Sequence, residues 1–89
     1  MYGSQYRYAV EVADQETGIY VATMITNDAT DVIQLSKDLT LTEFRVVIFK
    51  QDNTSVYLRS DFVKFDLTGM TVHQRYAEFS KLLDVLANM

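Results

Sequence analysis

Apolar and polar positions alternate along residues 6–12, which is the periodicity of a half-buried β-strand. The large side chains of this segment fall on one face, at Tyr6, Tyr8, Val10 and Val12. The polar segment 14–18 follows and ends in Gly18, a residue that accepts the positive φ of many hairpin turns. Residues 19–26 are rich in β-branched side chains, which favours a second strand. Residues 6–26 are therefore predicted to form a β-hairpin.

The pattern changes at Asn27 and Asp28, either of which is suited to cap a helix. Beyond them, the less polar side chains fall on one side of a helix, at Ala29, Val32, Ile33 and Ser36. This spacing predicts a helix of about three turns over 28–38. Residues 39–42 fit either a connector or the start of the next strand.

Residues 44–50 are apolar on both faces, which is typical of a central strand. Asp52 and Asn53 predict a turn into a further strand over 55–59, and hence a second hairpin. Ser60 and Asp61 interrupt the pattern as a break or a bulge. Residues 62–65 either extend that strand or form a fifth one.

A long amphipathic helix is predicted over residues 72–89. Thr71 and Gln74 have the spacing of a capping box, in which each side chain bonds the other residue's backbone amide. The predicted apolar stripe consists of Val72, Tyr76, Phe79, Leu83 and Leu86, widened by Leu82 and Met89. Glu78 lies three residues from both Arg75 and Lys81, so both basic residues are expected to pair with it on the solvent side.

The element order is β-β-α-β-β-(β)-α, which predicts one α+β domain spanning residues 1–89. Four or five strands would form a small antiparallel sheet, with two helices packed on one face. A chain of 89 residues has room for a single modest core, and it contains no internal repeat or linker.

The segment around Arg75-Tyr76-Ala77-Glu78-Phe79 resembles the lipid-binding helix of phosphoinositide-reading PX domains. The resemblance covers residues 72–86 and implies that Arg75 contacts a lipid phosphate. The family has a second basic residue where this chain has Gln74, and a proline-rich loop where this chain has no proline. We therefore assign no family membership, and ligand binding of this type is kept as a remote alternative.

Charge and residue types exclude several kinds of site. The net charge is −4, and the eight basic residues are scattered singly along the chain, so a nucleic-acid footprint is not predicted. The absence of cysteine excludes disulfides and thiolate metal sites. His73 is the only histidine, and the carboxylate pairs Asp28–Asp31 and Asp61–Asp66 do not have the spacing of a calcium loop. No catalytic, metal or cofactor-binding residue is predicted.

Function is therefore expected to lie in protein contacts made by an acidic surface that carries tyrosine. The predicted partner-binding residues are Glu11, Asp14, Glu16, Tyr20, Asp28, Asp31, Asp38 and Glu43. The hypothesis is a non-catalytic binding module, in particular a small acidic inhibitor of the phage anti-defence or anti-CRISPR type. It would mask a basic, nucleic-acid-handling surface of a partner protein, without contacting nucleic acid or membrane directly.

Two alternatives stand beside this hypothesis. The first is a homo-oligomeric assembly component, for instance a homodimer, joined through sheet edges or through the stripe on residues 72–89. The second is a small enzyme. The N-terminus lacks the apolar segment of a signal peptide, and no apolar run reaches the length of a membrane span. A cytoplasmic location is therefore expected, in the host cytoplasm if the chain is viral.

Overall fold

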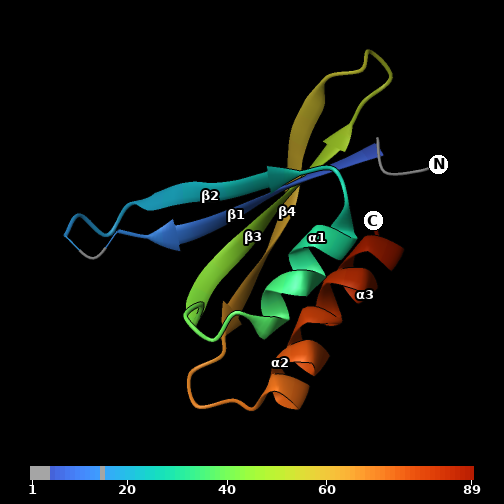
Figure 1. Cartoon of the computed structure of the whole chain (residues 1–89). Coiled ribbons are helices and arrows are strands. Elements are labelled where there is room, and N and C mark those ends of the chain that lie inside the picture. The colour runs from blue at the N-terminus through green and yellow to red at the C-terminus, as the bar shows by residue number, and fades with distance from the viewer. Residues whose placement is uncertain (1–4, 15) are drawn as a thin grey trace.

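The computed structural model describes residues 5–14 and 16–89, and its four strands form one antiparallel sheet (Figure 1). The strands are β1 (Tyr6–Ala13), β2 (Tyr20–Thr26), β3 (Glu43–Gln51) and β4 (Tyr57–Asp66). They lie in the order β2-β1-β3-β4, so β1 and β3 are central. The predicted α+β class with an antiparallel sheet is confirmed, and so is the central position of the strand that begins near Phe44.

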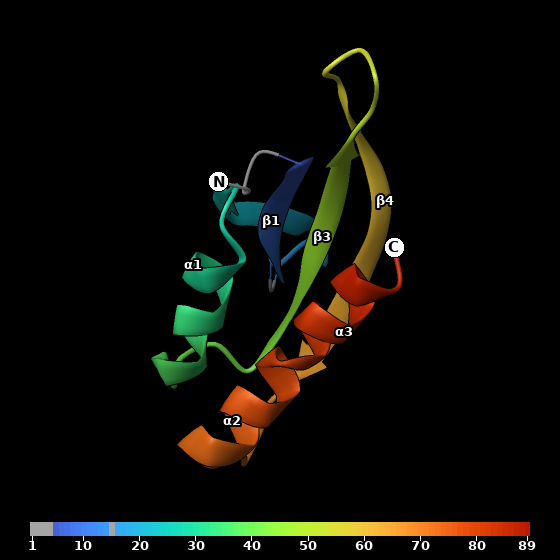
Figure 2. The ribbon, with the colours of Figure 1, turned by 90° about the vertical axis from the view of Figure 1, so that its right-hand side faces the viewer.

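The helices lie on one face of this sheet, and the other face is left uncovered (Figures 1 and 2). The first helix is α1 (Ala29–Gln34), which continues as the 3₁₀ turn η2 (Leu35–Lys37). The chain ends in α2 (Val72–Phe79) and α3 (Lys81–Ala87). None of the helices in the described part of the chain is long and apolar enough to cross a membrane.

Three phenylalanine rings form the centre of the core. Phe44 on β3, Phe65 on β4 and Phe79 on α2 have ring centroids 4.8–5.6 Å apart, and each is at most 1% exposed. Aromatic pairs at such distances gain energy beyond the area that they bury. Val32 of α1 is also fully buried in this cluster, so both halves of the helix layer contribute to the same core.

Local signals around the turns are confirmed. Asp28 is the N-cap of α1, where its Oδ1 accepts a hydrogen bond from the backbone amide of Thr30 at 2.8 Å. Gly18 has a φ of 72°, a backbone angle that residues other than glycine rarely adopt.

The interruption at Ser60 and Asp61 is a β-bulge within one continuous strand, because the pairing of β4 with β3 shifts register between Ile48 and Phe49. The sheet therefore has four strands among the described residues, and 62–65 belong to β4.

The predicted helix over 72–89 is present but interrupted at Ser80, which separates α2 from α3. The Ser80 hydroxyl donates to the carbonyl of Ala77 at 2.6 Å, a contact of the kind that bends helices. The capping box is confirmed: the Thr71 hydroxyl accepts from the Gln74 amide at 3.2 Å, and the Gln74 side chain accepts from the Thr71 amide at 2.9 Å. Pairing of Lys81 with Glu78 is also confirmed, at 2.7 Å.

Arg75 overturns the predicted orientation of this helix. Its side chain is 3% exposed, and its Nη1 donates to the carbonyls of Asp38 at 3.1 Å and Leu41 at 2.7 Å. Pairing of Arg75 with Glu78 on the solvent side is therefore wrong. The loop between η2 and β3 presents carbonyl groups that require donors, and Arg75 supplies them.

Burial of Arg75 rotates the apolar stripe away from its predicted position. Phe79 and Leu82 are buried with Arg75, at the spacing i, i+4, i+7. Other members of the predicted stripe face solvent instead: Val72 is 49%, Tyr76 58% and Leu83 48% exposed. The spacing rule correctly identified a helix but placed its buried face about one residue away from the real one.

Phe79→Ala is expected to lower the free energy of unfolding by about 3–5 kcal/mol, since it removes the ring that joins α2 to Phe44 and Phe65. Urea denaturation followed by circular dichroism measures the change. Tyr76→Ala is the matched control on the exposed side of the same helix, with an expected change within about 0.5 kcal/mol. Equal losses for the two variants would contradict the described orientation of α2.

Arg75→Met is expected to cost about 2 kcal/mol or more, because two backbone carbonyls lose their donor at about 1–3 kcal/mol each. Lys81→Met removes the same charge from an exposed position and is expected to change stability little. The same denaturation experiment compares the two variants. Wild-type stability of Arg75→Met would show that these contacts do not hold the loop.

Candidate binding face of the sheet

The eight residues of the predicted acidic surface are distributed over the sheet, one hairpin turn and the helix layer. They are Glu11 on β1, Asp14 and Glu16 in the first turn, Tyr20 on β2, Asp28 and Asp31 at the start of α1, Asp38 after η2, and Glu43 at the start of β3. The structure brings Glu11 and Tyr20 to the same arginine, Arg45. The first hairpin turn and α1 lie on different parts of the molecule (Figure 1).

Several of these aspartates form turns. The Oδ1 atom of Asp14 accepts from the backbone amide of Glu16 at 2.7 Å, and that of Asp38 accepts from the amide of Thr40 at 3.0 Å. Asp52 does the same in the second hairpin, where its Oδ1 accepts from the amide of Val56 at 2.9 Å. Such contacts let the aspartate side chain stabilise the backbone of a turn. Much of the acidic composition therefore has a local structural role.

The uncovered side of the sheet is organised in three cross-strand rows, which we call the open face. The rows are Arg7–Phe49–Arg59, Ala9–Val47–Phe62 and Glu11–Arg45–Lys64, each running from β1 through β3 to β4. The middle row is apolar, and Ile25 of β2 extends it beside Ala9. Both flanking rows carry two basic residues. Directly opposed side chains on one face of a sheet lie close enough to interact.

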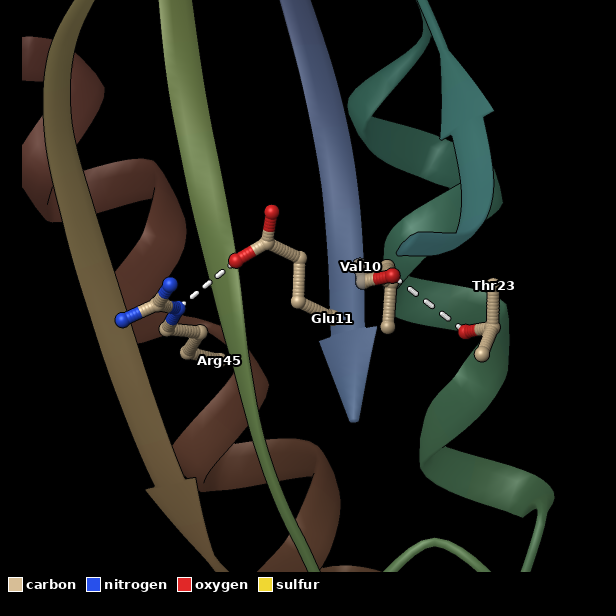
Figure 3. A network of polar contacts seen from close by, with 4 residues as sticks. All are labelled: Val10, Glu11, Thr23 and Arg45. Atoms are coloured by element: carbon tan, nitrogen blue, oxygen red, sulfur yellow. Dashed lines mark hydrogen bonds and ion pairs between the residues drawn. The ribbon is translucent and has the colours of Figure 1, made fainter. Parts of the chain in front are cut away.

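Arg45 connects three strands across the open face. Its Nε donates to Glu11 Oε1 at 2.7 Å (Figure 3), and its guanidinium carbon lies 4.0 Å from the ring centroid of Tyr20. The same carbon lies 6.0 Å from the ring of Phe62 on β4. Arg59 approaches Phe62 too, at 5.7 Å. Guanidinium groups over aromatic rings gain electrostatic and packing energy, so these side chains are held in place.

A second arginine–aromatic contact lies toward the other end of β1. The guanidinium carbon of Arg7 lies 4.3 Å from the ring centroid of Tyr57. The Tyr57 hydroxyl accepts a hydrogen bond from Asn27 Nδ2 at 3.2 Å, and the same Asn27 nitrogen donates to the carbonyl of Tyr6 at 3.1 Å. Tyr57 of β4 is thereby connected to the segment that follows β2. Side-chain contacts therefore hold residues of the open face at both ends of β1.

Charge separates between the open face and the rest of the molecule. Strand register places four of the eight basic residues there, namely Arg7, Arg45, Arg59 and Lys64. The same register places three of the twelve acidic residues on the open face. Glu43 and Asp66 are a cross-strand pair where β3 begins and β4 ends, and Glu11 lies opposite Arg45. The remaining nine acidic residues lie in the loops, on the helices or on the helix side of the sheet. Although the chain is acidic, this face carries a positive excess.

Sequence reasoning missed this site because the basic residues stand far apart along the chain. Their convergence depends on which residues pair across the strands, and composition does not determine register. One signal was present: Arg7 and Glu11 alternate with the apolar residues of the first strand, so they had to share the face away from the core. Alternation alone does not place Arg45 on this face, because residues 44–50 are apolar on both faces.

A shallow groove of about 580 Å³ lies between the end of β2 and α1. Among its lining residues, Asp31 accepts from the Thr26 hydroxyl at 2.6 Å, and the carboxylate of Asp38 bonds Thr40. These carboxylates are already engaged in intramolecular contacts. The open face is therefore the stronger candidate for a functional surface.

Asp38→Asn is expected to reduce the fall in the free energy of unfolding as the pH is lowered into the acid range. The Thr40 hydroxyl and amide hold the pKa of the Asp38 carboxyl below its ordinary value of 3.8, so the folded state binds the proton less readily than the unfolded state. This stabilisation is present above pH 3.8 and is lost as pH falls through the lower folded pKa. Asparagine keeps an acceptor for the turn but does not titrate there.

Urea denaturation at intervals between about pH 6 and pH 2 measures this effect. Asp84→Asn is the control, because the Asp84 carboxylate accepts no hydrogen bond within residues 5–14 and 16–89. The two variants have the same net charge, so a difference between their profiles reports on the Asp38–Thr40 contact. An Asp38→Asn profile parallel to the wild type would rule out the contribution of the Asp38–Thr40 contact.

Comparison with known proteins adds no relative to this description. No protein-family model matches the sequence, and neither a curated protein nor a solved structure is significantly similar to it. The functional assignment therefore depends on the site itself.

Proposed function

We propose that this chain is a non-catalytic binding module that docks a partner on the open face of its sheet. The observation that supports this function best is an apolar row between two rows of basic residues, with exposed side chains at its two ends and buried Ala9 and Val47 between them. A sheet covered by helices on one side normally presents polar side chains to water on the other. Here Phe62 is 44% and Ile25 65% exposed at the two ends of the apolar row.

Preorganisation of the basic side chains also favours binding. Arg45 is fixed by Glu11 and by the ring of Tyr20, and Arg7 by the ring of Tyr57. A long side chain that is already ordered loses less conformational entropy when a partner docks on it. Arginine and aromatic residues are also the types most enriched among residues that dominate interface energies.

The acidic inhibitor predicted from the sequence is the second candidate function. The observation that favours it is that nine of the twelve acidic residues lie off the open face. A basic protein surface would therefore meet the helix layer and the loops, around Asp28, Asp31 and Asp38. On this proposal the chain masks a nucleic-acid-handling surface of its partner, as a phage anti-defence or anti-CRISPR inhibitor would.

Site-specific photo-crosslinking in the cells that encode the chain separates the two surfaces. A photoreactive phenylalanine analogue at position 62 is expected to give covalent adducts, because this side chain lies on the open face. The same analogue at position 76 is the matched control, since Tyr76 is an exposed aromatic residue of the helix layer. Gel electrophoresis and mass spectrometry detect the adducts and distinguish protein from nucleic acid.

Adducts from position 76 but not from position 62 would reject the open face and favour the acidic-surface candidate. Adducts with the mass of two identical chains would instead support the homo-oligomeric alternative. The absence of adducts at both positions would contradict a binding module that uses either surface.

A further inference from the structure

We propose that the ligand of the open face is single-stranded nucleic acid, an inference that rests on the binding function proposed above. Such a ligand has two chemical requirements, which are cations for its phosphates and flat surfaces on which unpaired bases stack. The open face supplies both, within the three cross-strand rows and at Tyr20 and Tyr57 beside them. Arg7, Arg59 and Phe62 each take part in an arginine–aromatic contact.

The cationic requirement is met by residues that remain uncompensated. Only Arg45 is paired with a carboxylate on this face, while Arg7, Arg59 and Lys64 make no ion pair with any residue in the described ranges 5–14 and 16–89. All three are exposed. They lie on β1 and β4, on either side of β3, so a backbone that crosses the sheet meets a cation on both sides. Three to four phosphate contacts are therefore within reach.

The stacking requirement is met by aromatic rings interleaved with these cations. Phe62 is 44% exposed in the middle row, with Lys64 and Arg59 of its own strand in the two flanking rows. Tyr20 and Tyr57 are half-buried, each with a guanidinium plane over its ring. Bases stack on aromatic rings and on guanidinium planes alike. Adjacent strands lie about 4.8 Å apart, so rings and guanidinium groups on neighbouring strands are close to one another.

The same features argue for a single strand over a duplex, an acidic peptide or a second copy of this chain. A duplex hides the faces of its bases, so the aromatic rings would have no stacking partner. An acidic peptide would neutralise the cations but would not use the exposed ring of Phe62. A second copy docked face to face would bring together two surfaces with the same positive excess, and repulsion between like charges weakens association.

Charge on the rest of the molecule restricts the ligand to this face. The helix layer and the loops carry most of the acidic residues, so they repel phosphates. An acidic protein with one cationic face is expected to bind a strand in one orientation. Because only three or four phosphates are engaged, the logarithm of the binding constant is expected to fall with the logarithm of salt concentration with a slope of about −2 to −3.

Fluorescence anisotropy with purified protein tests this inference. The probes are fluorescein-labelled oligothymidylate and oligouridylate of about 12 nucleotides, at about 50 mM salt, and the two together distinguish DNA from RNA. Saturable binding of at least one probe is expected, with the salt dependence given above. A self-complementary duplex of the same length is expected to bind at least about tenfold more weakly.

Matched variants show whether the open face is responsible. Phe62→Ala and Lys64→Ala are each expected to weaken binding about tenfold, by removing a stacking surface and a phosphate contact. Tyr76→Ala and Lys81→Ala remove an exposed aromatic ring and an exposed charge from the helix layer, and are expected to leave binding unchanged. Melting curves verify that all four variants are folded.

Three results would overturn the inference. They are no binding of either oligonucleotide, equal losses for the open-face and helix-layer variants, and preference for the duplex. A binding assay with a labelled polyglutamate peptide shows whether only the nucleic-acid ligand is wrong or whether the open face binds no partner at all. If the peptide binds and Lys64→Ala weakens it while the oligonucleotides do not bind, the open face is a docking surface for acidic protein. If nothing binds and crosslinking at position 62 gives no adduct, both proposals are rejected.

Discussion

The guanidinium group of Arg75 joins α2 to the loop that leads into β3, and the orientation of the helix layer follows from this contact. With Arg75 turned inward, Phe79 and Leu82 face the sheet one and two turns later, and the phenylalanine cluster closes over β3 and β4. Burying a charge is costly unless its donors are satisfied, and here backbone carbonyls supply acceptors for Nη1. A residue that suggests a ligand site in the sequence thus serves the fold. The phosphate contact implied by the resemblance to PX domains would require a side chain that is 3% exposed.

Basic and acidic residues have different tasks in this chain. Aspartates in three turns accept backbone amides, in a sequence that has no proline and three glycines. Four of the eight basic residues instead lie on the open face of the sheet, where arginines cover aromatic rings. Net charge therefore describes this molecule poorly, because the sign of the whole chain differs from the sign of its open face. A partner responds to the local field at the surface that it meets.

Features governed by neighbouring residues were predictable from the sequence. The capping box at Thr71, the N-cap at Asp28 and the turn at Gly18 depend on contacts within a few positions, so local rules identified them. The burial of Arg75 and the convergence of Arg7, Arg45 and Arg59 were not predictable in the same way. Both depend on contacts between residues more than thirty positions apart, such as Arg75 with Asp38 and Arg45 with Glu11. The proposed site is made of such long-range contacts, whereas the predicted acidic surface was read from residue types alone.

The two β-bulges have a consequence for which side chains the open face contains. Thr23 in β2 and Ser60 in β4 are the unpaired extra residues at the register shifts, and the Thr23 hydroxyl is held by the carbonyl of Val10 at 3.2 Å (Figure 3). In a regular strand, alternation beyond these points would turn Tyr20, Tyr57 and Arg59 toward the helix side and bring Leu58 and Ser60 to the open face. Each bulge therefore reverses which of the alternating side chains face the open side of the sheet. One inserted residue per strand decides whether the rings and guanidinium groups of both strand segments point to the same side of the molecule.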